Sequence, residues 1–374
     1  MTTASSSIAT PTGQGRWGPW LFSAPVDLLA FLGSAVLALM LLAYGGWAGL
    51  LHEASPEWTW VPLVLLIDVA HVYATGFRVY FDRQELARRP LLYGGGPLLC
   101  YVLGVALYSE SDLLFWRVLA YLAVFHFIRQ QYGWVALYRA RAGERDGWGK
   151  RIDSGAIYAA TLYPLLYWHA HLPRQFAWFV DGDFGQLPAL LSRLAFPFYV
   201  AVLTAYAIRS VLQWRRGRPQ LGKDIVVATT VVCWYVGIVS FNSDYAFTVT
   251  NIIIHGVPYM VLVFWFWQFK PAPSQTSQLS LPAADRAAPE RRSWWPALVM
   301  FVATIWLLAY AEELLWDWTI LRERPWLFGP GFRTPDGWQL WIAPLLAVPQ
   351  ATHYLLDGFI WRRRSNPDMR TVTR

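Results

Sequence analysis

The sequence predicts an all-α protein, a bundle of about ten helices that cross a membrane. Hydrophobic residues make up 56% of the 374 residues and charged residues only 15%, whereas soluble domains carry about 25% charged residues. The 23 Trp and 19 Tyr are also typical of membrane proteins, because these amphipathic rings collect at membrane–water interfaces.

Ten apolar runs approach the roughly 20 residues that a membrane-spanning helix needs. In chain order the predicted spans are 25–51, 59–81, 91–109, 113–138, 154–171, 189–213, 224–242, 246–269, 294–316 and 337–361.

The basic residues indicate the orientation of these spans. Of the 31 Lys and Arg, 22 lie in six segments that alternate with five segments that hold only four. Because cytoplasmic loops are enriched in Lys and Arg, this alternation predicts that both termini are cytoplasmic. The net charge of +7 is therefore a signal of topology, and no nucleic-acid partner is expected.

Three segments outside the spans have distinct compositions. Residues 1–24, rich in Ser, Thr, Gly and Pro, are expected to form a disordered N-terminal tail. Residues 25–361 form the predicted transmembrane domain. Within it, the Pro- and Ala-rich residues 271–293 are predicted to form a mobile linker. Residues 362–374 are a basic tail, which the charge pattern places in the cytoplasm.

Four of the predicted helices each carry one histidine near the middle of the membrane, namely His71, His126, His255 and His353. Ionisable groups are costly in hydrocarbon, so such residues face the bundle interior and often mark function. The simpler alternative is that they are polar contacts between helices.

Each of these histidines has a polar neighbour three or four residues away, on its own helix face. Such neighbours suit metal-ligating imidazoles, whose second nitrogen is usually held by a carboxylate or amide. The aspartates could also be direct ligands, as carboxylates are in di-iron bundles. The neighbours are Asp68 and Thr75 for His71, Arg129 and Gln130 for His126, Asn251 for His255, and Gln350 and Asp357 for His353.

This pattern predicts a metal site. The candidate ligands are the four histidines with Asp68 and Asp357, and the candidate cofactor-binding residues are Arg78, Arg129, Gln130, Asn251 and Gln350. Both cysteines lie inside apolar runs, and histidine plus carboxylate without thiolate suits non-haem iron. Zinc is an alternative.

A site inside a bilayer implies a lipid-phase substrate such as an acyl chain, isoprenoid, carotenoid or sterol. The expected chemistry is hydroxylation, desaturation or oxidative cleavage at a membrane-bound oxidoreductase. The expected partners are this lipophilic substrate, membrane lipids and, as a candidate, an electron donor. The expected location is the bacterial inner membrane.

The scattered single histidines resemble those of the bacterial membrane carotenoid-cleaving dioxygenases, at the positions His71, His126, His255 and His353. The resemblance implies one non-haem iron held by histidines from separate helices. Membrane desaturases carry dense His boxes, and this chain has none.

Three other functions fit the same residues. In a bis-histidine haem protein, Arg129 or Arg78 would pair with a propionate. In a transporter or proton-coupled channel, Asp68, Arg129 and Asp357 would form the relay. In a non-catalytic scaffold, the polar layer would only hold helices together.

Four ionisable residues are expected outside the site. Glu312 and Glu313, near the outer end of their helix, are predicted to lie at the membrane interface, and His169 and His171 are predicted to cap the outer end of the fifth span.

Overall fold

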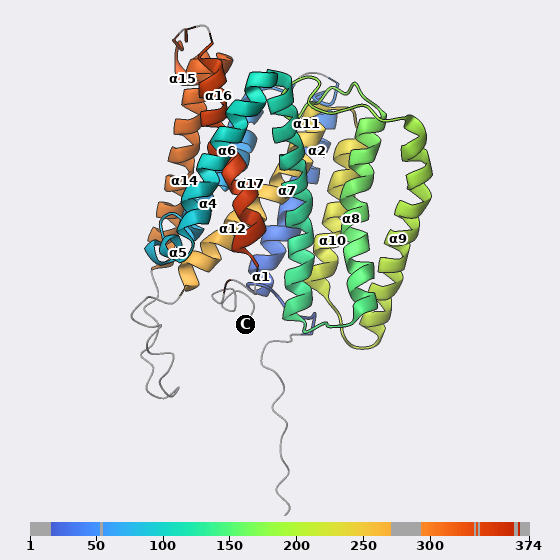
Figure 1. The fold of residues 1–374 in the computed structure, drawn as a ribbon. Coiled ribbons are helices and arrows are strands. Elements are labelled where there is room, and N and C mark those ends of the chain that lie inside the picture. Colours follow the sequence, from blue (N-terminus) through green and yellow to red (C-terminus); the bar gives the residue numbers. More distant parts are fainter. Residues whose placement is uncertain are drawn as a thin grey trace, which may run out of the picture.

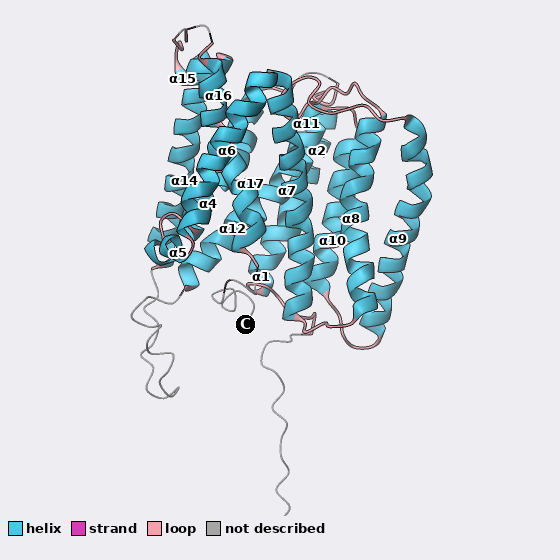
Figure 2. Cartoon of the chain, in the orientation of Figure 1, coloured by secondary structure: helices cyan, strands magenta, loops and turns pink. Residues whose placement is uncertain are grey.

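The computed structural model describes residues 16–52, 55–270, 293–332, 334–335, 337–362 and 366. All regular elements in these ranges are helices, as Figure 2 shows. The all-α prediction is therefore confirmed. Most of the predicted N-terminal tail, linker and C-terminal tail lies outside the described residues.

Figure 1 shows the helices in chain order. In several places π-helical turns, labelled η, continue an α-helix. In order they are α1 Ala24–Asp27, η1 Leu28–Gly33, α2 Ser34–Trp47, α3 Glu57–Trp60, η2 Val61–Val69, α4 Ala70–Arg78, α5 Arg83–Arg88, α6 Pro90–Glu110, α7 Asp112–Arg141, α8 Gly147–Ala170, α9 Ala189–Arg215, α10 Leu221–Trp234, η3 Tyr235–Ser240, α11 Asp244–Phe247, η4 Thr248–Ile252, α12 Ile253–Phe269, α14 Trp294–Trp316, η7 Asp317–Leu321, α15 Pro325–Phe328, α16 Gln339–Leu346 and α17 Val348–Ile360.

Several helices begin at residues whose side chains can cap them. Ser111 accepts a hydrogen bond from the backbone of Leu114 at the start of α7, and Asp146 accepts one from Gly149 at the start of α8. Pro90 opens α6 at a position where a missing N–H costs nothing. These caps satisfy backbone donors that the first helical turn leaves free.

Among the described residues, seven helical stretches are long and apolar enough to cross a membrane. They indicate an integral membrane protein. They are 24–47, 57–78, 90–110, 189–215, 221–240, 244–269 and 294–321, and each overlaps one predicted span. The other three predicted spans coincide with α7, with α8 and with α16 followed by α17.

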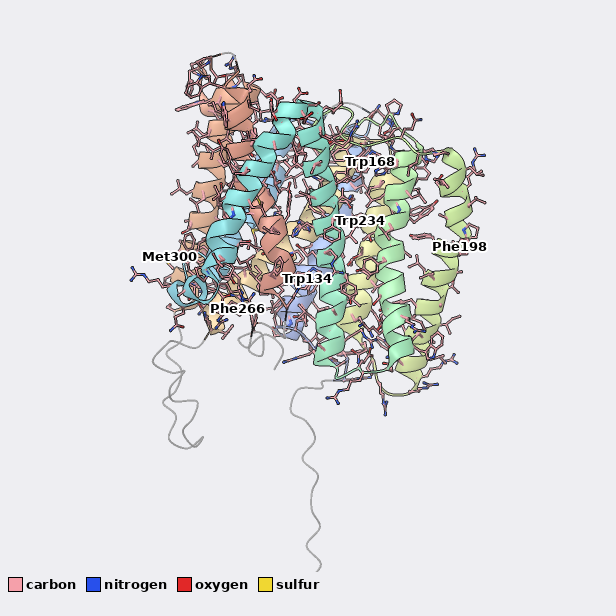
Figure 3. The ribbon with its side chains drawn as sticks, in the orientation of Figure 1. Trp134, Trp168, Phe198, Trp234, Phe266 and Met300 are labelled. Carbon is pink, nitrogen blue, oxygen red and sulfur yellow. The ribbon has the colours of Figure 1, made fainter. Side chains whose placement is uncertain are left out.

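Apolar side chains cover the outside of the bundle as well as its interior. Trp134, Trp168 and Trp234 are each 2% exposed and lie among the helices in Figure 3. Phe198 on α9 and Met300 on α14 are 75% and 50% exposed, at opposite sides of the bundle. A water-facing surface of this kind would be unfavourable, whereas lipid chains solvate it.

An ion-pair cluster joins α7, α8, α9 and α10 at the lower end of Figure 1. Asp153 of α8 accepts bonds from Arg139 at 2.5 Å, Arg209 at 2.8 Å and Lys223 at 2.9 Å. Glu144, in the connection after α7, also binds Lys223. Burial alone would raise the Glu144 pKa, but the nearby cations and an amide hydrogen bond hold it below its ordinary value. Arg209 of α9 is thus held in this cluster.

The four histidine-bearing helices meet in the middle of the bundle. Helix α4 packs against α12 and α17, and α7 packs against the same two helices. Gly256 permits the approach of η2 to α12, because a Cβ at this position would lie 2.6 Å from Ile67 Cγ2 and 3.2 Å from the Ile67 carbonyl oxygen. A small residue is therefore required one position after His255.

We expect Gly256→Ala to destabilise the protein by about 1–3 kcal/mol, because the added methyl group overpacks a close helix contact. Gly94→Ala on α6 is the matched control, since a Cβ there meets nothing within 4 Å. Thermal unfolding of the detergent-solubilised variants measures the difference. Equal melting temperatures for the two variants would contradict the close contact.

Candidate metal centre

Four imidazoles converge at the centre of the bundle, and each comes from a different helix. The Nε2 atoms of His71 and His255 lie 3.1 Å apart, as do those of His126 and His353. Ring nitrogens of His71, His126 and His255 all lie within 4.8 Å of one another. The four side chains are at most 2% exposed. The predicted histidine layer is thus a single cluster.

The opposite ring nitrogens of three histidines face polar side chains. Thr75 Oγ1 lies 2.8 Å from His353 Nδ1. His126 Nδ1 lies 3.5 Å from Asp357 Oδ2, and His71 Nδ1 lies 3.7 Å from Asp68 Oδ1. Both carboxylates therefore lie behind the imidazoles, on the side away from the facing Nε2 atoms.

The positions of the two carboxylates influence which ring nitrogen of His71 and His126 carries the proton and which has the free lone pair. A carboxylate near Nδ1 favours the tautomer that carries its proton on Nδ1, as in carboxylate–histidine–metal triads. In His71 and His126 the Nε2 lone pairs then face the shared centre. Nitrogens bound about 2.1 Å from one ion lie roughly 3 to 4 Å apart, which matches the 3.1 Å separations. The residues present therefore fit a metal ion.

The charges of the surrounding residues are also compatible with a bound divalent cation. Four neutral imidazoles can bind a divalent cation but cannot neutralise it, and an uncompensated charge in a membrane interior is costly. The carboxylates of Asp68 and Asp357 supply two negative charges directly behind His71 and His126. Together with a divalent ion, this set is neutral.

Aromatic rings fix the orientation of the imidazoles. Phe127 stacks on His255 with ring centroids 3.5 Å apart, and Tyr354 stacks on His126 at 5.1 Å. The Tyr259 hydroxyl lies 3.1 Å from Thr75 Oγ1. Tyr259 did not emerge as a site residue from the sequence, although its position four residues after His255 places it on the same helix face.

Two of the predicted companions contact something other than their own histidine. Gln130 donates to the backbone carbonyl of His255 at 2.8 Å, so it ties α7 to α12. Asn251 donates to the Phe247 carbonyl and to Thr250, and His255 Nδ1 has no hydrogen-bond partner among the described residues. The expectation that Asn251 holds the His255 ring is wrong.

The remaining cofactor candidates lie at different distances from the cluster. Arg78 is buried away from it and bonds to the Ile360 carbonyl and to Glu85. Arg129 donates to the Tyr158 hydroxyl at 2.5 Å and lines a cavity beside His126. Gln350 lines another cavity, which reaches His71.

The glutamate pair on α14 differs from the prediction. Glu312 and Glu313 are 4% and 8% exposed, so they are buried in the bundle, whereas an interfacial position suggested exposed side chains. The Trp316 indole donates to Glu312 at 3.2 Å. The isolated sequence could not reveal this, because burial depends on how α14 is rotated against η2 and α4.

The other two predicted outer histidines lie in local contacts. His169 bonds to the Leu165 carbonyl at 2.7 Å and to the Tyr121 hydroxyl at 3.1 Å. His171 bonds to the Tyr167 carbonyl at 2.7 Å. The Leu165 and Tyr167 carbonyls belong to the last turns of α8, so both histidines bond to its C-terminal end, in agreement with the capping prediction.

Two cavities with mainly apolar and aromatic linings reach the histidines from different sides. One of about 670 Å³ is lined by His126, Asp357, Leu162, Tyr158 and Trp361, among others. The second, of about 310 Å³, is lined by His353, Thr75, Phe81, Pro97 and Leu308, among others. Volumes of this size are typical of small-molecule sites.

Comparisons of this chain with protein-family models, with curated proteins and with solved structures found no match.

Thr75→Val should destabilise the protein by roughly 1–3 kcal/mol, because it removes a buried hydroxyl that bonds to both His353 and Tyr259 and leaves the His353 Nδ1 without that partner. Thr304→Val on α14, where the hydroxyl bonds to the Met300 carbonyl, is the matched control and should cost less. Denaturant titration of both variants tests this. A Thr75→Val protein as stable as the wild type would contradict the hydrogen bonds.

Proposed function

We propose that this chain is a membrane-embedded, metal-dependent oxidoreductase with non-haem iron held by His71, His126, His255 and His353. The observation that carries the proposal is the convergence of four Nε2 atoms from four helices, in two pairs 3.1 Å apart. Without a metal, each pair can form an N–H···N hydrogen bond, whereas a bound cation would be shared by all four lone pairs.

The donor set suits non-haem iron, with zinc as an alternative, and gives haem less support. All the converging donors are imidazole nitrogens, which suit iron and zinc. Haem has less support, because a porphyrin would have to pass between imidazoles whose nitrogens are only 3.1 Å apart. Iron, when bound, would supply dioxygen activation.

The chain's own residues would hold and orient the metal ligands. Asp68 and Asp357 would keep the protons of His71 and His126 on Nδ1, and Thr75 would hold the His353 ring. This supporting role fits their positions better than the direct ligation that the sequence allowed. The stacked Phe127 and Tyr354 rings would limit ring rotation and exclude water.

The apolar cavities support a lipid-phase substrate. They reach His126 and His353 from two sides, so a long apolar molecule could place one of its bonds beside the histidines. An acyl chain, isoprenoid, carotenoid or sterol has this character. The reaction would be hydroxylation, desaturation or oxidative cleavage.

The proposed setting is the bacterial inner membrane, with ten spans and both termini in the cytoplasm. The seven apolar helices support membrane insertion, and the alternation of Lys and Arg between segments supports the remaining three spans and the orientation. The lower end of the bundle in Figure 1 would then face the cytoplasm.

We expect purified wild-type protein to contain stoichiometric iron by elemental analysis, and His71→Ala, His126→Ala and His353→Ala to lose it while remaining inserted in the membrane. His171→Ala is the matched control, because His171 bonds to a backbone carbonyl outside the cluster. Full metal content in the three cluster variants would refute the proposed site, and a strong Soret band would favour haem.

A further inference from the structure

A third cavity, of about 420 Å³, is lined both by residues of the bundle end where α11 and α15 lie, the upper end in Figure 1, and by His71 of the histidine cluster. Its lining includes Glu57 of α3 and Glu323 after η7 near the helix ends, and Asp68 and His71 in the interior. The Asp68 side chain is 33% exposed even though His71, one turn further on, is 2% exposed. The cavity therefore gives solvent access to the carboxylate directly behind a proposed metal ligand.

The lining of this cavity is strongly acidic. Its charged residues are Glu57, Asp68, Asp244, Glu313 and Glu323 against one cation, Arg324. The Arg324 guanidinium bonds to Glu323 at 3.0 Å and lies over the Trp60 ring, so part of its charge is already offset. A cleft of one sign of charge with low-dielectric walls concentrates counter-ions and raises their association rate.

A second, independent feature lies at the inner end of the cavity. His71 lines the cavity, and its Nδ1 is a fully buried polar atom with no hydrogen-bond partner among the described residues, 3.7 Å from Asp68. Glu313, 8% exposed, adds a second buried carboxylate to the same wall. The acidic lining thus continues from the surface to the imidazole.

The two apolar cavities are poor routes for a hydrated ion. Their linings are mainly aromatic and aliphatic, and a divalent cation loses most of its hydration energy in such surroundings. The acidic cavity is therefore suited to ions, and the two apolar cavities are suited to a lipid.

We infer that this cavity, defined by Glu57, Asp68, Asp244, Glu313 and Glu323, is a cation vestibule through which a divalent metal ion reaches the four histidines from the upper end of the bundle. The inference rests on the proposed metal site, and it adds the route by which the metal ion enters that site. Glu313 acts as a transient carboxylate ligand for the incoming ion, and the final ligands are the imidazoles.

The test follows Co²⁺ uptake by metal-free protein in lipid nanodiscs, read from the visible absorbance of bound Co²⁺ after rapid mixing. Glu313→Gln should slow uptake by roughly tenfold at low ionic strength, because the amide lacks the carboxylate that receives the incoming ion in the vestibule. The final occupancy should equal that of the wild type, and added salt should reduce the difference in rate.

Two variants serve as controls. Glu110→Gln makes the same change at the exposed upper end of α6, outside the vestibule, and should load at the wild-type rate. Glu313→Asp keeps the charge and should restore most of the rate, which separates loss of charge from misfolding.

Uptake by Glu313→Gln at the wild-type rate would overturn the vestibule while leaving the metal site intact. A lower final occupancy in Glu313→Gln would also overturn it, because Glu313 would then be part of the bound state. Wild-type protein that binds neither Co²⁺ nor iron would refute the proposed function itself, and the vestibule with it.

Discussion

Facing imidazole nitrogens in the middle of an apolar bundle are the interaction on which the rest of this structure depends. His71 and His255 form one pair, and His126 and His353 form the other. Two facing nitrogens in a low-dielectric interior need a proton or a cation between them, and in the proposed function a metal ion takes this place. Asp68 and Asp357 then balance the charge from behind the rings.

The packing of the surrounding helices serves this geometry. Gly256 brings α12 against η2, and Gln130 of α7 bonds to the carbonyl of His255. The stretch η2 carries Asp68 directly before α4 and His71. Because π-helical turns shift side chains around the helix axis, they are often found at functional sites.

In the proposed function, the three cavities would serve different tasks on different sides of the cluster. Apolar walls lead to His126 and His353, and acidic walls lead to His71. A lipid substrate and a metal ion need opposite surroundings. Separate approaches allow a single buried centre to receive both.

The sequence was sufficient to predict the helical class, the approximate helix ranges and the four histidines at one level, because hydrophobic run length and mid-run polar residues are local signals. It could not predict contacts between helices. Asp357 was paired with His353 from its spacing of four, yet it lies beside His126 of another helix. Thr75 was assigned to His71 and instead bonds to His353. Glu313 was placed at an interface and is buried. Each difference depends on the rotation of one helix against another, which periodicity does not specify.

X-ray absorption at the iron edge of the purified protein tests the central claim most directly. We expect a first shell of nitrogen and oxygen scatterers with the multiple scattering of several imidazoles, and no iron–sulfur distance, since the donors at the centre are histidines. A spectrum with porphyrin scattering, with sulfur ligands or with no imidazole contribution would contradict the four-histidine centre.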